Sequence, residues 1–180
     1  MKTRDLIYCA LFAALTAIGA FLQIPTGTVP ITLQFLFTAL AGLLLGWKWG
    51  AISQLLYVGI GLLGLPVFTQ GGGIGYVLQP SFGFLLGLIP AAAVIGALTA
   101  RRTGYLTVLA AVLVGDLILY AVGVPYMYLI LHVYMQSAKT FPALLAAMLV
   151  YVPGDTLKII VVTALAPVLR RTLVKAVPNL

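Results

Sequence analysis

Long apolar runs separated by short polar or charged stretches dominate the pattern of this chain. Each run is about as long as a bilayer-spanning helix, which needs roughly 20 apolar residues. Membrane β-strands would instead be about ten residues of strict alternation. The pattern therefore predicts an all-α integral membrane protein, a single membrane domain over residues 1–180 with six transmembrane helices. The predicted helices cover residues 6–24, 31–47, 51–68, 82–100, 106–124 and 153–171.

One apolar stretch, residues 126–152, is too long for a turn and too apolar for a solvated loop. We expect it to form a partly helical extracellular cap between the fifth and sixth helices. The alternative is a last span that begins near Pro142 and is kinked at Pro153. We favour the cap, because proline suits the first turn of a helix and residues 153–171 already have the length of one bilayer.

The composition excludes a soluble domain, because 63% of the residues are hydrophobic and 7% are charged, against about 25% charged in soluble proteins. With a cytoplasmic N-terminus, basic residues gather on the cytoplasmic side, as the positive-inside rule requires. These are Lys2, Arg4, Lys48, Arg101, Arg102, Arg170, Arg171 and Lys175, and Lys139 alone falls outside. Both termini are therefore expected to be cytoplasmic, in the plasma membrane of a prokaryote, and the net charge of +7 calls for no nucleic acid.

The first segment has an alternative interpretation as a cleaved signal peptide, because a basic start, an apolar middle and small residues follow one another. Its apolar run continues through Ile24, beyond a cleavage site, and this favours a membrane span.

Charged residues inside the predicted spans are the candidate functional groups, because burying an ion costs several kcal/mol unless it is paired. Asp155 and Lys158, in "VPGDTLKII", share one helix face at the outer end of the sixth span. They either neutralise each other and lock helices together, or hold a polar ligand. Their place near a helix N-terminus, where free amides favour an anion, supports a ligand. For Asp116, ligand contact and a role in holding helices or orienting Lys158 are both open.

Three uncharged polar residues are placed near the same outer face and complete the predicted binding set. They are Gln34, Tyr76 and Gln79. The glycine-rich run before Tyr76 is not a phosphate loop, because no Lys-Ser or Lys-Thr pair follows it. It forms either a loop that closes over a ligand or a plain turn between helices.

Catalytic and metal-binding constellations are not expected, because the chain has three acidic residues, one His and one Cys. The chain is therefore predicted to bind without chemistry: no enzyme, no cofactor and no metal. Uphill transport would need energy from a partner. Small residues on one side of the first helix either pack inside the bundle or form a docking surface for that partner. They are Ala10, Ala13, Ala14 and Ala17.

The segments "VPITLQF", "LAGLLLG", "LLYVGIGLLGLPVF", "VGDLILYAVGVP" and "VPGDTLK" together resemble the BioY family, the biotin-specific S components of energy-coupling factor (ECF) transporters. The resemblance covers about residues 5–172. It implies a six-helix protein that captures biotin at an outward-facing site. It also implies a transmembrane coupling protein and two cytoplasmic ATPases as partners.

The resemblance further implies that Asp155 and Lys158, which match the family's Pro-Gly-Asp-x-x-Lys motif, contact the ligand. It makes the alanine face of the first helix the docking surface for the coupling protein. One motif departs from the family pattern. Where members commonly have Gly-Pro-Thr-Gly-Gly-Tyr, this chain has Gln-Pro-Ser-Phe-Gly-Phe over residues 79–84, which loses a tyrosine hydroxyl.

Two other functions are compatible with the sequence. The first is a small oligomeric channel or structural membrane subunit without a tight ligand site, and the second is a membrane enzyme. In the channel, Asp116, Asp155 and Lys158 would only lock helices together. The sequence leaves open whether the ligand is biotin or a precursor such as dethiobiotin. It also leaves open whether the chain acts alone, as a homo-oligomer in the lipid, or only with ECF partners.

Overall fold

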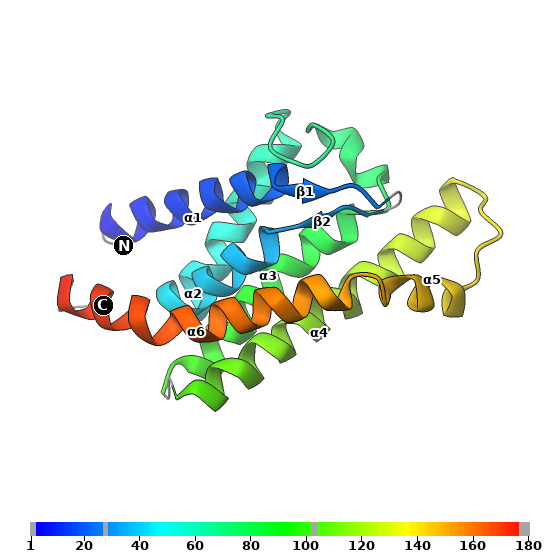
Figure 1. Ribbon diagram of the computed structural model, residues 1–180. Helices are drawn as coiled ribbons and strands as arrows, with labels where there is room; N and C mark the ends of the chain where they lie inside the picture. Colours follow the sequence, from blue (N-terminus) through cyan, green and yellow to red (C-terminus); the bar gives the residue numbers. More distant parts are fainter. Residues whose placement is uncertain (1–2, 27–28, 102–103, 177–180) are drawn as a thin grey trace.

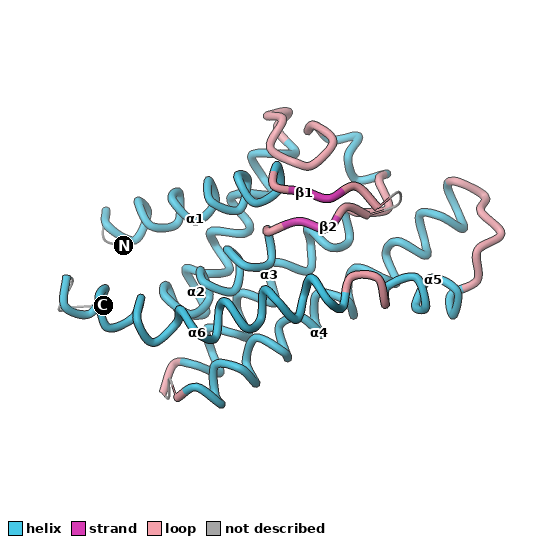
Figure 2. The backbone as a smooth tube through the Cα atoms, viewed as in Figure 1, coloured by secondary structure: helices cyan, strands magenta, loops and turns pink. Residues whose placement is uncertain are grey.

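A computed structural model describes residues 3–26, 29–101 and 104–176, with side chains up to residue 169. It is a bundle of helices with one short β-hairpin (Figures 1 and 2). The elements, in chain order, are α1 (Thr3–Phe21), β1 (Gln23–Ile24), β2 (Ile31–Thr32), α2 (Gln34–Leu62), the 3-10 helix η1 (Ile74–Leu78), α3 (Phe82–Thr99), α4 (Tyr105–Leu129), the π-helical turn η2 (Ile130–Tyr134), α5 (Phe141–Met148) and α6 (Val152–Ala176).

Five helices in the described part of the chain are long and apolar enough to cross a membrane. The second of them, α2, contains a sharp bend at Gly46, whose φ of 78° and ψ of 177° are not helical. Thr38 donates a 2.9 Å hydrogen bond to Gln54, 16 residues further on, whereas a straight helix would separate them by about 24 Å. The two arms of α2 therefore run antiparallel, and they correspond to the predicted second and third helices. Glycine at the bend is required by the positive φ.

Four predicted helix boundaries were wrong. The second helix begins at Gln34 rather than residue 31, because Ile31 and Thr32 form strand β2. The first helix ends at Phe21 rather than residue 24, because the chain then forms strand β1, which pairs antiparallel with β2. The third ends at Leu62 rather than residue 68, followed by Gly64 at a φ of 106°. The fifth was expected to stop at Val124, yet α4 continues through Pro125. Apolar helices in membranes tolerate proline because neighbouring groups satisfy the freed carbonyl.

The region predicted as a cap contains one short helix, α5, while its first part belongs to α4 and η2. Leu144 and Met148 of α5 are buried in a small apolar cluster with Val124 and Met127 of α4. Residues 149–151 form a turn between α5 and α6, so the alternative of one kinked span from Pro142 is wrong. As predicted, Pro153 lies in the first turn of α6.

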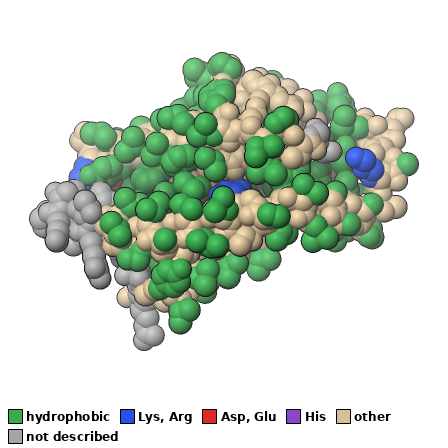
Figure 3. All heavy atoms as spheres, viewed as in Figure 1, with side chains coloured by type: hydrophobic (Ala, Val, Ile, Leu, Met, Phe, Trp, Pro, Cys, Tyr) green, Lys and Arg blue, Asp and Glu red, His purple; other side chains and the backbone are tan. Residues whose placement is uncertain are grey.

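The start of α1 and the end of α6 lie at one end of the bundle, and the α4–α5 connection lies at the other (Figure 1). Lys48 belongs to the end with the termini, because its neighbours Trp47 and Trp49 contact α3 near Gly96 and Cys9 of α1. Lys139 is in the α4–α5 connection. Lys2 and Arg102, and the side chains of Arg170, Arg171 and Lys175, lie outside the described residues, and the side that faces the cytoplasm stays a prediction. The visible face is mostly apolar, as lipid contact requires (Figure 3).

Close helix packing at Gly42 gives a stability prediction. A Cβ atom there would lie 2.5 Å from the backbone oxygen of Ala92 in α3, and backbone cannot move aside as a flexible side chain can. We expect Gly42→Ala to destabilise the purified protein by about 1–3 kcal/mol, as other overpacked sites do. The measurement is the thermal unfolding midpoint in detergent.

Gly59→Ala is the matched control, because nothing lies within 4 Å of a Cβ atom at that helical position. Its unfolding midpoint should stay the same or rise, since alanine favours a helix over glycine. Equal midpoints for both variants would contradict the close contact between α2 and α3.

Candidate ligand-binding site

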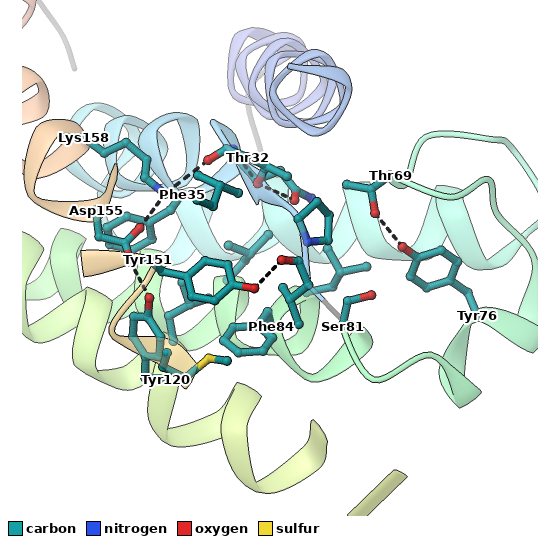
Figure 4. A pocket seen from close by; sticks show the side chains of 18 residues that line it. Thr32, Phe35, Thr69, Tyr76, Ser81, Phe84, Tyr120, Tyr151, Asp155 and Lys158 are labelled. Carbon is teal, nitrogen blue, oxygen red and sulfur yellow. Dashed lines mark hydrogen bonds and ion pairs between the residues drawn. The ribbon is translucent and has the colours of Figure 1, made fainter. Parts of the chain in front are cut away.

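A cavity of about 640 Å³, open mouth included, lies among the β-hairpin, α2, α3, α4 and α6. Polar side chains occupy two ends of the cavity, and apolar ones fill the middle (Figure 4). The apolar lining includes Phe35, Phe84, Leu88, Leu119 and Met148.

At one end, Asp155 and Lys158 form an ion pair with 2.5 Å between Oδ1 and Nζ. Each residue is 7% exposed. Lys158 Nζ also donates to the backbone oxygen of Thr32 at 3.2 Å, and the Tyr120 hydroxyl donates to the second Asp155 oxygen. An ammonium has three donors and a carboxylate about four acceptor positions. Both groups are therefore held in place by the chain and keep hydrogen-bonding capacity for a ligand.

The start of α6 explains how the chain builds this end. Pro153 lies in the first helical turn, and the Asp155 N–H bonds the Tyr151 oxygen at 2.9 Å. An acidic side chain in the first turn is stabilised by the helix dipole. The i,i+3 spacing then places Lys158 on the same face as Asp155.

The other polar end consists of hydroxyl groups. Tyr76, which is 5% exposed, shares a 2.9 Å hydrogen bond with Thr69, and Ser81 lines the cavity beside them. Figure 4 shows this group well separated from Asp155 and Lys158, with Phe84 and Tyr151 between them. The cavity thus suits a ligand with two polar ends and an apolar middle.

Four of the six predicted binding residues line the cavity: Asp155, Lys158, Tyr76 and Gln34. The Gln34 side chain is held from both sides, because it accepts from Thr32 and donates to Tyr57, each at 2.8 Å. Gln34 therefore has a structural role in the cavity wall and can also contact a ligand.

The other two predicted residues are not among those that line the cavity. Gln79 is exposed in the short link between η1 and α3. Asp116 is half-buried one helical turn before Tyr120, and its Oδ1 atom is buried without a hydrogen-bond partner among the described residues. Its position next to Tyr120 favours an indirect role over ligand contact.

The four alanines of α1 divide into two pairs. Ala10 and Ala14 are exposed on the outside of the bundle. Ala13 is 4% exposed and belongs to the apolar core, and Ala17 is half-buried against it. Only Ala10 and Ala14 are thus free to meet another protein, and the docking role itself stays a prediction.

Five polar residues that line the cavity were not predicted from the sequence, namely Thr32, Thr69, Ser81, Tyr120 and Tyr151. Tyr120 follows Asp116 by one helical turn, so it could have been found from the spacing. Tyr151 bonds the backbone oxygen of Val29 at 2.5 Å, across a tertiary contact for which the sequence pattern has no signal.

No group of three or more His, Cys, Asp or Glu side chains that could hold a metal ion occurs within the described ranges.

Residues 1–175 match the BioY family. The chain is 54% identical over 142 residues to the probable biotin transporter BioY of Lysinibacillus sphaericus, covering 78% of this chain and 72% of that protein. It is 35% identical over 164 residues to the biotin transporter BioY of Thermotoga maritima, covering 91% and 94%. A crystal structure of the S-component for biotin from an ECF-type ABC transporter superposes with a TM-score of 0.83, at 31% identity and over 95% of each chain.

Proposed function

The chain belongs to the BioY family, and from this premise we propose that it captures biotin for uptake as the substrate-binding S component of an ECF-type transporter. The observation that carries the proposal is the buried Asp155–Lys158 pair at one end of a cavity lined by polar and apolar side chains. Its relatives are transporters rather than enzymes. The chain is accordingly a multi-pass protein of a prokaryotic plasma membrane that binds biotin as its cargo and needs no cofactor.

Biotin, like the cavity, has two polar ends and an apolar middle. Its ureido ring offers two N–H donors and one carbonyl acceptor, its sulfur ring and chain are apolar, and its tail ends in a carboxylate. Asp155 can accept from a ureido N–H while Lys158 donates to the carbonyl. The ligand's carboxylate does not suit this end, because Asp155 lies 2.5 Å from Lys158 and would repel it. The ureido ring is therefore placed against the ion pair.

The remaining residues take different parts in the proposed site. Tyr76 faces the ligand's tail, and Gln34 holds the wall beside Thr32. Asp116 acts from behind Tyr120, which donates to Asp155. Gln79 is exposed and outside the cavity lining, so we assign it no direct ligand contact.

The proposed partners supply energy, because uptake against a gradient needs a nucleotide-hydrolysing subunit. They are a transmembrane coupling protein and two cytoplasmic ATPases of the ABC type. We place the docking surface at Ala10 and Ala14, whose small exposed side chains allow another helix to approach closely within the lipid.

Equilibrium binding of radiolabelled biotin to the purified chain in detergent tests the proposal. We expect saturable binding at one site per chain with a submicromolar Kd, displaced by unlabelled biotin. An oligomeric channel or a structural subunit would show no saturable site. Displacement by dethiobiotin in the same assay ranks biotin against its precursor.

A further inference from the structure

The hydroxyl end of the cavity is formed by Thr69, Tyr76 and Ser81, and among the residues that the structure describes none places a cation there to pair with an anion. The sequence has no Lys or Arg between Arg4 and Lys48 or between Lys48 and Arg101. All three hydroxyl residues, and the loop and helices that carry them, fall in the second of these intervals.

Lys139, predicted to lie outside, and Lys158, at the outer end of the sixth helix, do not supply a cation at the hydroxyl end. Lys139 is exposed in the α4–α5 connection and is not among the residues that line the cavity. Lys158 lines it at the opposite end, where Asp155 already neutralises its charge (Figure 4). The cavity as a whole therefore carries no net positive charge for a ligand anion.

Hydroxyl groups donate and accept hydrogen bonds, so they serve a neutral amide as well as a carboxylate. Tyr76 and Ser81 are 5% and 8% exposed, and an ionised carboxylate placed among buried neutral groups loses hydration without gaining a counter-ion. A neutral amide in the same place loses less hydration free energy.

We propose that this chain recognises the tail of its ligand as a neutral group and therefore also binds biotin amides, in which an amine nitrogen replaces one carboxylate oxygen. The proposal rests on the proposed function, and it adds a substrate class to it. The ureido ring keeps its place at Asp155 and Lys158, and the amide takes the place of the carboxylate at Thr69 and Tyr76.

The N-terminus of α3 is another feature that could favour a carboxylate, because Ser81 precedes its first residue, Phe82. Two amides there are already engaged, since the Phe82 N–H bonds Gln79 and the Phe84 N–H bonds Ser81, at 3.0 and 3.1 Å. A helix terminus favours an anion only modestly compared with a buried ion pair. Its usual contribution corresponds to a preference of about two- to fivefold.

Competition between radiolabelled biotin and the primary amide of biotin, on the purified full chain, tests this inference. The primary amide has nearly the size of the acid and differs mainly in charge. We expect its Kd to lie within tenfold of that of biotin. If the amide binds more than tenfold more weakly than biotin, the site recognises the negative charge of the biotin carboxylate, and the inference is overturned.

A pair of variants adds a positive control. Thr69→Lys places a cation at the tail and should raise the ratio of amide Kd to biotin Kd at least tenfold above that of the natural chain. Thr69→Gln, of similar length and neutral, should leave the ratio unchanged. A Lys variant that binds biotin with an unchanged ratio would place the ligand's tail elsewhere and contradict the inference.

The two proposals fail in different ways. If labelled biotin shows no saturable binding, the proposed function is wrong. If biotin binds tightly and its amide does not, the function stands and only the neutral recognition of the tail is wrong.

Discussion

Replacing either Asp155 or Lys158 by Ala is expected to weaken biotin binding at least tenfold. Each residue is 7% exposed and 2.5 Å from the other. Removing one leaves its partner as an uncompensated charge and removes a hydrogen-bonding group for the ureido ring. Losses of about 2–5 kcal/mol are typical when one member of a buried charge pair is truncated. The measurement is the Kd for radiolabelled biotin.

Thr156→Ala is the matched control, because Thr156 lies between the two residues on the exposed side of α6 and bonds only the Val152 backbone. Its Kd should match that of the natural chain. In the double variant, the loss should be smaller than the sum of the two single losses, since the residues also pair with each other. Unchanged affinity in both single variants, with normal membrane insertion, would refute the site.

The second large effect is expected for Ala14→Trp on α1, which should abolish co-purification with the coupling protein and the ATP-dependent part of biotin uptake. Ala14 is exposed on the outside of the bundle, as Ala10 is one turn before it. A bulky ring there keeps a partner helix from approaching closely. Biotin binding by the isolated chain should stay within a few-fold, because α1 does not contribute to the cavity lining.

Ala110→Trp is the control for this variant, because Ala110 is an exposed alanine of α4. It should assemble and transport normally. If Ala14→Trp unfolds the chain, the alanine face packs internally instead of docking. If it assembles and transports like the control, the docking surface lies elsewhere.

The sequence by itself determined the membrane class and most of the helices. Runs of about 20 apolar residues leave no other stable arrangement in a bilayer, because every backbone group must be satisfied within the segment. The start of α6 was also predictable, since Pro153 is favoured in a first turn, and with it the pairing of Asp155 and Lys158 on one face. These features depend on local covalent geometry and on the solvent, and both can be derived from the residues.

Helix ends near proline and glycine were harder to predict. Pro125 lies inside α4, although the same residue type lies in the first turn of α6 at Pro153. A proline ends a helix in one setting and continues it in another, depending on whether neighbouring helices satisfy the freed carbonyl. The two-residue strands β1 and β2 are also too short to show an alternating pattern.

Only the tertiary structure decided which polar side chains share the cavity. Tyr120 and Asp155 are 35 residues apart, and Lys158 and Thr32 are 126 apart. Long-range pairs of this kind depend on how the bundle packs, and a single sequence has no periodic signal for them. The same packing separates Ala13, buried in the core, from Ala14, exposed on the outside. Adjacent residues of one helix point about 100° apart, and only the neighbouring helices determine which of the two directions is covered.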